Sequence, residues 1–333
     1  MGDEVMVTQE EKMASTIEPH GAKGLPFAHT DLLDTAELTG AEISFLLDQS
    51  EAFFEINKRQ VKKVPTLRGV TIMDCFFEPS TRTRSSFELA GKRLSADVIN
   101  FSAAGSSLKK GESLRDTART LAAMGTDLIV VRHPAAGAAA SLAEELAVPV
   151  INAGDGCHAH PTQALLDLFT LRRAFGRLEG LKVAIIGDIA HSRVARSNLL
   201  AMRTLGMETR ICAPPTLLPA AVERYGCSVF HHLPSAIAGV DAIMMLRIQR
   251  ERASSGAFPS LREYARNYCL TRAHLALAAP HCVILHPGPI NRGVEIASDV
   301  ADSPRSLILD QVTAGVAVRM AILYVLWQQG SGQ

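Results

Sequence analysis

The sequence predicts an α/β protein with two doubly wound, parallel-sheet domains and a C-terminal helix that returns to the first domain. Two observations carry this prediction. Eight short apolar runs alternate with amphipathic segments along a chain of 333 residues. Parallel strands that are buried on both faces read as continuous apolar runs, and helices between them indicate βαβ units. A chain of this length divides into two domains of roughly 150 residues each.

The apolar runs are the predicted strands, at Val70–Phe76, Val98–Phe101, Leu128–Val131, Val148–Ile151, Val183–Ile186, Ile211–Cys212, Ala242–Leu246 and Val283–Leu285. Helices are predicted between them at Ser86–Leu94, Ser113–Met124, Thr162–Phe175 and Ser197–Leu205. An earlier helix is indicated by Thr39 with Glu42 three residues later, which is a capping-box pattern. Together these elements give an alternating order of strand and helix.

Turn residues and apolar content predict how the chain divides. Residues 1–30 show no periodicity, so we expect a flexible N-terminal tail. The turn-rich stretch Asn152–Gly156 places the boundary so that the first domain covers 31–161 and the second covers 162–311. The strongly apolar segment Val312–Trp327 needs a core to cover it, so residues 312–330 are expected to rejoin the first domain. Ligands are expected beyond the carboxyl ends of the strands.

Composition excludes several classes of protein. Lys plus Arg and Asp plus Glu both number 34, and this zero net charge argues against nucleic-acid or membrane-surface partners. The six cysteines form no C-x-x-C pair, and His158 and His160 have no third ligand nearby, so no metal site is indicated. The N-terminus lacks an apolar signal core, and no uninterrupted apolar run reaches the ~18 residues of a membrane span. We therefore expect a soluble, cytoplasmic protein.

The segment after the first predicted strand is suited to binding phosphate. Pro79 ends the strand, and Ser80 can cap the helix that follows. The backbone N–H groups of Thr81, Arg82 and Thr83 then lie at a helix start, where the dipole favours an anion. Hydroxyl and guanidinium groups add charge-assisted hydrogen bonds. The alternative interpretation is an ordinary helix cap with surface arginines.

Ser-Thr-Arg-Thr-Arg at residues 80–84 resembles the phosphate-binding signature of the aspartate and ornithine carbamoyltransferase family. The resemblance runs from about residue 30 to the C-terminus and includes seven motifs in family order. It implies that 31–161 with 312–330 binds carbamoyl phosphate and that 162–311 binds aspartate. It also implies a homotrimer with shared active sites.

Three further motifs match the carbamoyl phosphate site of the family. The resemblance implies that Arg132 contacts the phosphate and the carbonyl oxygen of this substrate. In His160-Pro-Thr-Gln163, it implies that the histidine donates to the carbamoyl carbonyl and that the glutamine holds the NH₂ group. In His-Pro-Gly288-Pro289, backbone carbonyls are expected to accept from the NH₂ group and from the attacking amine. The family often has a larger apolar residue at position 288.

The remaining motifs match the amino-acid side of the site. The resemblance implies that Arg193 holds a substrate carboxylate and that Arg247 with Gln249 reads the carboxylates of aspartate. Ser106 and Lys110 match the mobile loop that reaches the neighbouring subunit's site. Arginines at both positions suit a dicarboxylate and repel the ammonium group of ornithine. The implied catalytic residues are Arg82, Thr83, Arg132, His160 and Lys110.

The resemblance therefore implies transfer of the carbamoyl group of carbamoyl phosphate to L-aspartate, in de novo pyrimidine biosynthesis and without a metal or organic cofactor. The nearest alternative is an ornithine-type or other amino-acid transcarbamoylase. An NAD-dependent dehydrogenase is disfavoured because no G-x-G-x-x-G pattern follows Gly187. A catalytically inactive partner subunit is disfavoured because every expected polar residue is retained. The tail and Asn291–Glu295 resemble a bacterial type that associates with dihydroorotase-like chains. Assembly with such chains, or with regulatory chains, stays open.

Overall fold

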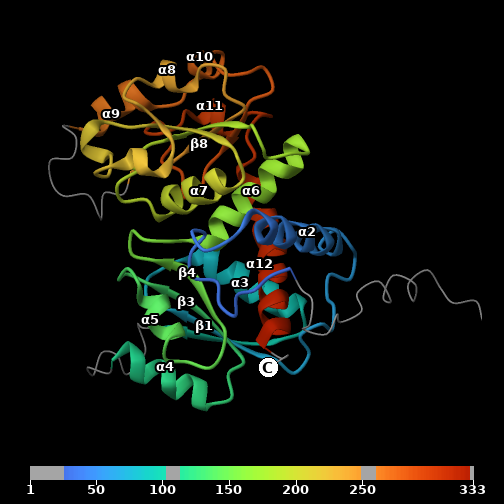
Figure 1. Cartoon of the computed structure of the whole chain (residues 1–333). Helices are drawn as coiled ribbons and strands as arrows, with labels where there is room; N and C mark the ends of the chain where they lie inside the picture. Colours follow the sequence, from blue (N-terminus) through green and yellow to red (C-terminus); the bar gives the residue numbers. More distant parts are fainter. Residues whose placement is uncertain (1–25, 103–112, 249–259, 331–333) are drawn as a thin grey trace, which may run out of the picture.

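The residues that the structure describes form two parallel sheets, one in each half of the molecule (Figure 1). The computed structural model describes residues 26–102, 113–248 and 260–330. The first sheet has the strand order β2-β1-β3-β4 and the second has the order β7-β6-β5-β8-β9. All neighbouring strands pair in parallel. The predicted fold class, two doubly wound parallel-sheet halves, is confirmed.

The strands of the first sheet are β1 (Thr71–Phe76), β2 (Asp97–Ser102), β3 (Leu128–His133) and β4 (Val150–Asp155). The helices that follow its first three strands are α3 (Thr81–Arg93), α4 (Leu114–Ala123) and α5 (Ala138–Ala143). Side chains of β1 alternate between two apolar clusters, because successive residues of a strand face opposite sides of the sheet. The sheet is thus buried on both faces, as its continuous apolar runs predict.

The strands of the second sheet are β5 (Lys182–Ile186), β6 (Glu208–Cys212), β7 (Ser228–Phe230), β8 (Ala242–Met245) and β9 (Val283–Leu285). Its α-helices are α7 (Arg193–Thr204), α8 (Leu233–Ile237), α9 (Leu261–Tyr268), α10 (Arg272–Leu275) and α11 (Ser298–Ala301). Two short 3-10 helices lie at Pro215–Leu217 and Val222–Tyr225. Strand β7 is absent from the prediction because it has three residues and lies at a sheet edge, where burial is incomplete.

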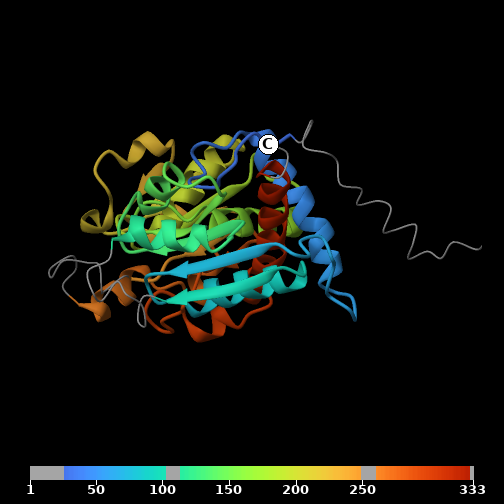
Figure 2. The ribbon, with the colours of Figure 1, turned by 90° about the horizontal axis from the view of Figure 1, so that it is seen from below.

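Three helices join the two halves: α2 (Gly40–Ile56), α6 (Pro161–Phe175) and α12 (Ile308–Gly330). Helix α12 packs beside α2, α3 and α6, and the views in Figures 1 and 2 agree on its place beside α2. The C-terminal helix therefore returns to the first half, as predicted. By length and composition α12 is apolar enough to cross a membrane, but most of it is buried inside the protein. This burial accounts for its composition.

Several element boundaries differ from the prediction. Helix α3 begins at Thr81 rather than Ser86, and α7 begins at Arg193 rather than Ser197. In α7, the side chain of Ser192 accepts from the backbone of Ala195 and so caps the helix earlier. Strand β4 continues to Asp155, so most of the predicted turn-rich junction is strand. The exact division of the chain into domains stays a prediction.

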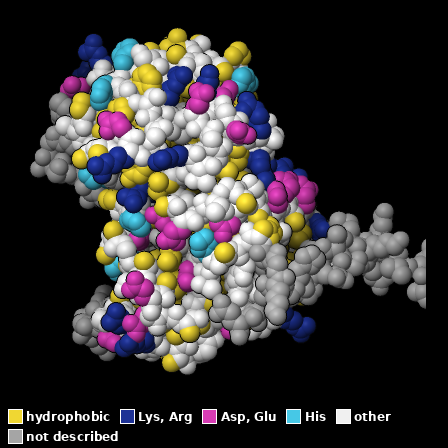
Figure 3. Space-filling model, in the orientation of Figure 1, with side chains coloured by type: hydrophobic (Ala, Val, Ile, Leu, Met, Phe, Trp, Pro, Cys, Tyr) yellow, Lys and Arg dark blue, Asp and Glu magenta, His cyan; other side chains and the backbone are white. Residues whose placement is uncertain are grey.

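Surface charge is mixed. Lysine, arginine, aspartate and glutamate side chains are interspersed over the face shown in Figure 3. This pattern agrees with the zero net charge of the chain.

Candidate active site

Helix α3 begins where β1 ends, and its first turn is built for an anion. Ser80 is the N-cap residue with an extended backbone (φ −159°), but its side chain makes no capping hydrogen bond. The first turn contains no acidic residue. The first intrahelical bond joins the Arg84 N–H to the Ser80 carbonyl at 3.2 Å, so the N–H groups of residues 81–83 have no intrahelical acceptor. The positive end of the helix dipole is therefore directed toward the end of the sheet.

Arg132 and Arg193 meet on one carboxylate, that of Glu78. The Glu78 Oε1 atom lies 2.7 Å from Nη2 of Arg132 and also accepts from Nη2 of Arg193. Glu78 follows β1, Arg132 lies near the end of β3, and Arg193 opens α7 of the second half. Glu78 was not among the predicted site residues. Its signal in the sequence was an acidic residue just before the basic turn that was predicted to bind phosphate.

Arg132 also reaches the start of α3. Its Nη1 atom donates to the backbone carbonyl of Ala153 at 3.2 Å and lies 3.5 Å from the hydroxyl of Thr83. These contacts aim the guanidinium group across the carboxyl ends of β1, β3 and β4. Two predicted ligands of the phosphate and carbonyl groups, Arg132 and Thr83, are therefore side by side.

A glycine makes room for Arg193. A Cβ atom on Gly154 would lie 2.9 Å from Cζ of Arg193, and the φ of Gly154 is +118°. Both the space and the backbone conformation therefore require glycine. Arg193 is 4% exposed, so its guanidinium group is held in a buried seam between the two halves. Gly154, in the Asn-Ala-Gly-Asp pattern at residues 152–155, thus leaves the space that the side chain of Arg193 occupies, although Arg193 is 39 positions later in the sequence.

Arg82 lies against the turn that follows β9. A Cβ atom on Gly288 would lie 3.0 Å from Cζ of Arg82, so a larger residue would displace this guanidinium group or the turn. Loss of hydration and, second, the guanidinium group of Arg247 lower the pKa of Arg82. The first half, the turn at Gly288–Pro289 and the strand end at Arg247 therefore face one another.

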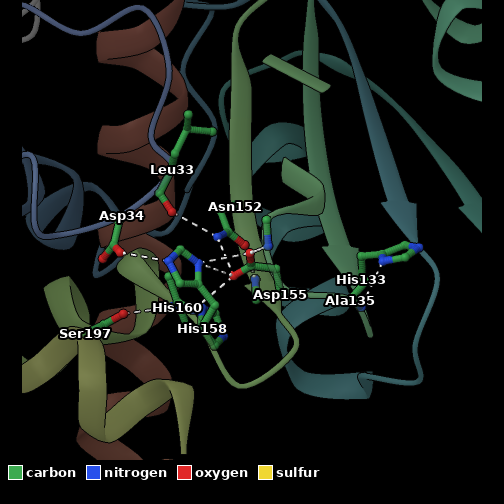
Figure 4. Close-up of polar contacts among 12 residues, drawn as sticks. Leu33, Asp34, His133, Ala135, Asn152, Asp155, His158, His160 and Ser197 are labelled. Atoms are coloured by element: carbon green, nitrogen blue, oxygen red, sulfur yellow. Dashed lines mark hydrogen bonds and ion pairs between the residues drawn. The ribbon is translucent and has the colours of Figure 1, made fainter. Parts of the chain in front are cut away.

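His160 is the N-cap residue of α6 and is 4% exposed. Burial lowers its pKa well below the usual value, and the positive charges of Arg132 and Arg193 lower it further. The imidazole is therefore neutral at physiological pH, with one ring nitrogen as a donor. Its backbone N–H donates to the hydroxyl of Ser197 on α7 at 2.9 Å, which ties it to the second half (Figure 4).

The loop that carries His160 is held by a buried carboxylate (Figure 4). Asp155 accepts from the backbone of Gly137 at 2.6 Å, from the backbone of Ala159 at 2.9 Å, and from the side chain of Asn152 at 2.9 Å. The ring of His158 lies 3.1 Å from Asp155 and 3.4 Å from Asp34. His158 is thus a structural link to the N-terminal segment, and the described residues contain no group of three or more potential metal ligands.

Gln163 lies in the first turn of α6, one turn from His160, and its side chain bonds to Asp167 at 2.8 Å. Gln249, Ser106 and Lys110 lie outside the described residues. The structure thus brings together the predicted residues that it describes, at the carboxyl ends of both sheets: Ser80, Thr81, Arg82, Thr83, Arg132, His160, Gln163, Arg193, Arg247, Gly288 and Pro289.

The chain matches two models of one family. Residues 30–173 match the carbamoyl-P binding domain of aspartate/ornithine carbamoyltransferase, and residues 179–326 match its Asp/Orn binding domain. A relative from Nitratidesulfovibrio vulgaris, strain Miyazaki F, is 58% identical over 90% of this chain and 92% of its own. A relative from Sorangium cellulosum is 57% identical over 90% of this chain and 94% of its own. Both are named aspartate carbamoyltransferase catalytic subunit.

Solved structures of the same family are also similar to this chain. Aspartate transcarbamoylase from Trypanosoma cruzi, in complex with carbamoyl phosphate and aspartate, is 31% identical, covers 88% of this chain and 95% of its own, and has a TM-score of 0.80. Ornithine carbamoyltransferase from Thermus thermophilus is 28% identical, covers 90% of this chain and 99% of its own, and also has a TM-score of 0.80. The chain belongs to the aspartate/ornithine carbamoyltransferase family.

Proposed function

We propose that the protein is an aspartate carbamoyltransferase. It transfers the carbamoyl group of carbamoyl phosphate to the amino group of L-aspartate, giving N-carbamoyl-L-aspartate and phosphate. One observation carries the proposal: the side chains of several arginines from both halves gather around the start of α3. These are Arg82, Arg132, Arg193 and Arg247. The high similarity to chains named aspartate carbamoyltransferase catalytic subunit supports the same activity.

Carbamoyl phosphate binds on the first half. Its phosphate group accepts hydrogen bonds from Ser80, from the N–H groups of residues 81–83, and from Arg132, and Arg82 offsets the charge that grows as phosphate leaves. The N–H groups and the helix dipole point where this charge develops. Binding at a preformed helix start also orients the reacting carbonyl, which lowers the entropic barrier of the reaction.

Aspartate binds on the second half. Arg193 and Arg247 hold its two carboxylates, and Gln249 and Lys110 add contacts. A site that presents two guanidinium groups disfavours the ammonium group of ornithine, because like charges repel at short distance. The overall fold does not discriminate between the two substrates, since an ornithine enzyme has the same TM-score as an aspartate enzyme.

The neutral amine of aspartate attacks the carbonyl carbon, and negative charge develops on the carbonyl oxygen. Arg132, Thr83 and the neutral His160 donate hydrogen bonds to that oxygen. One such donor contributes about 3 kcal/mol to the transition state, or about 10² in rate. We assign no protein base to the amine's proton; the departing phosphate is the remaining candidate. The substrate is already an activated acyl phosphate, so the reaction needs no metal or organic cofactor.

We further propose that the protein works as a cytoplasmic homotrimer in pyrimidine biosynthesis. Ser106 and Lys110 of each subunit complete a neighbour's site. Mixing Arg82→Ala protein with Lys110→Ala protein tests this arrangement, because hybrid trimers contain some sites with neither substitution. Each variant alone is expected to be nearly inactive, and the mixture is expected to regain activity. No regain after subunit exchange would contradict the shared site.

The activity is tested by measuring phosphate release from carbamoyl phosphate with aspartate, ornithine or putrescine in parallel. We expect phosphate release with aspartate and none with ornithine or putrescine. Release with ornithine but not with aspartate would replace the proposal with the ornithine-type alternative.

A further inference from the structure

A buried hydrogen-bond network lies directly beneath the carbamoyl end of the candidate site. Its centre is Asp167 on α6, which is 0% exposed. Oδ1 of Asp167 accepts from Nε2 of Gln163 at 2.8 Å and from Nε2 of Gln311 at 2.7 Å. Oδ2 accepts from Nδ2 of Asn198 at 2.8 Å. All three partners are amide donors, and they come from α6, α12 and α7.

This network determines which way the Gln163 amide faces. An ionised carboxylate only accepts hydrogen bonds, so the NH₂ group of Gln163 must face Asp167. The other end of the same amide, the Oε1 carbonyl oxygen, is then the end that is left for a substrate. If Gln163 were turned over, an amide oxygen would oppose a buried carboxylate, which is strongly unfavourable.

The network also reaches the turn after β9. Oε1 of Gln311 accepts from the backbone N–H of His286 at 2.9 Å. Nδ1 of His286 in turn accepts from the backbone N–H of Gly288 at 2.8 Å, while its Nε2 lies 3.2 Å from Glu295. The Gly288–Pro289 turn, which presents backbone carbonyls, is thereby connected through Gln311 to the same carboxylate as Gln163.

We propose that Asp167 is a positioning residue that makes the site specific for an acyl phosphate whose acyl group carries NH₂. By orienting Gln163 and, through Gln311, the Gly288 turn, it directs hydrogen-bond acceptors from two sides at the acyl substituent. This inference rests on the proposed function and names a determinant of its substrate choice. It assigns Asp167 no contact with the substrate itself.

Acetyl phosphate is the matched probe, because a CH₃ group replaces the NH₂ group at similar size. A methyl group donates no hydrogen bond, so the acceptors would be desolvated without a partner. Sites built around such hydrogen bonds reject the analogue by factors of about 10⁴ to 10⁵. Here we expect the ratio of kcat/KM for carbamoyl phosphate over acetyl phosphate to be about 10² or more, because the acceptors are partly exposed.

The experiment measures this ratio, with saturating aspartate, for the wild-type protein and for Asp167→Leu, Gln163→Met and their double variant. Asp167→Leu is expected to lower the ratio at least tenfold, mainly because kcat/KM for carbamoyl phosphate falls. The double variant is expected to lose less than the sum of the two single losses in the logarithm of the ratio, because part of the effect of Asp167 acts through Gln163 and the rest through Gln311. The control is Asp74→Asn, an equally buried aspartate outside the site, which is expected to leave the ratio unchanged.

An equal loss of rate with both acyl phosphates in Asp167→Leu would show a merely structural role and overturn the proposal. If Asp167→Leu does not fold, Gln311→Met carries the test, since it removes one donor to Asp167 and the bridge to His286. An unchanged ratio in that variant would also overturn the proposal. A wild-type protein that releases no phosphate from carbamoyl phosphate with aspartate would instead overturn the proposed function.

Discussion

Asp167 and Asp74 are two of the aspartates that are 0% exposed, and their surroundings differ sharply. Asp167 receives three amide hydrogen bonds beneath the active site. Asp74 lies on β1 between the apolar residues Ile72 and Phe76, and neither of its carboxyl oxygens has a hydrogen-bond partner among the described residues. Equal burial therefore does not mean an equal environment for the charge.

The difference appears in the two pKa values. Burial raises the pKa of Asp74 to about 8, with a further increase from Glu88, while Arg84 and Arg319 lower it. Burial also raises the pKa of Asp167, but the bonds from Asn198, Gln311 and Gln163 lower it, so that it reaches about 6. The gap of about two pH units corresponds to about 3 kcal/mol. Asp167 is therefore ionised at neutral pH, whereas Asp74 is largely protonated.

The largest effect on stability is expected from Asp167→Leu. This change leaves three buried amide donors without an acceptor, so we expect the free energy of unfolding to fall by about 3 to 5 kcal/mol. Urea denaturation at pH 7.5 measures it. Asp74→Asn is the matched control and is expected not to lower stability. An equal loss in both variants would mean that the amide bonds do not distinguish the two sites.

Asp74→Asn is expected to stabilise the protein increasingly as pH rises. The folded pKa of Asp74 lies above the unfolded value of 3.8, so the wild-type protein loses stability as pH rises from about 4 to about 8. Asparagine cannot ionise, and the variant therefore gains up to about 4 kcal/mol relative to wild type between pH 5 and pH 8. Denaturation of both proteins at these two pH values measures the gain. A gain that does not depend on pH would mean that Asp74 ionises normally in the folded protein.

Asp167 titrates in a lower window, with opposite consequences for stability and activity. Its raised pKa makes the wild-type protein lose stability from about pH 4 to about pH 6, with about 1 kcal/mol of that loss between pH 5 and pH 6. Over the same window the carboxylate forms and orients Gln163, so kcat/KM for carbamoyl phosphate is expected to rise. A pH–rate profile that shows no such rise, after correction for unfolding, would mean that ionisation of Asp167 does not affect the binding of carbamoyl phosphate.

The smallest effect is expected from changing Arg319, the buried arginine of α12 that interacts electrostatically with both aspartates. Burial lowers its pKa to about 10, so it is cationic at neutral pH. Arg319→Met removes this charge, and the acid-side midpoint of the pH–rate profile is expected to move up by roughly one pH unit or less. Arg319→Lys keeps the charge and is expected to leave the midpoint near its wild-type value. A midpoint that stays fixed in both variants would mean that the charge of Arg319 does not influence the pKa of Asp167.

Much of the fold was predictable from local patterns. Continuous apolar runs marked the buried strands, and the capping box at Thr39 and Glu42 is present at the start of α2. Boundaries were less predictable, because the start of α7 depends on a cap from Ser192 rather than on apolar spacing. The short edge strand β7 had no distinct apolar signal.

The chemical groups of the site were identifiable from motifs, but their mutual arrangement was not. Glu78 binds both Arg132 and Arg193, and both arginines lie more than 50 positions later in the sequence. The links from Asp167 to Gln311 and from His160 to Ser197 join helices that meet only in the folded protein. Spacing within a motif carries no information about such contacts.

The sequence by itself determined the alternating α/β order, the helix start that can bind phosphate, and the family, because each depends on residues that are neighbours along the chain. Tertiary structure alone decided which acid holds the arginines and which buried aspartate keeps its charge. The physical reason is that the energy of a buried charge depends on the donors that surround it. Here those donors come from α6, α7 and α12, which the chain brings together only when both halves are packed.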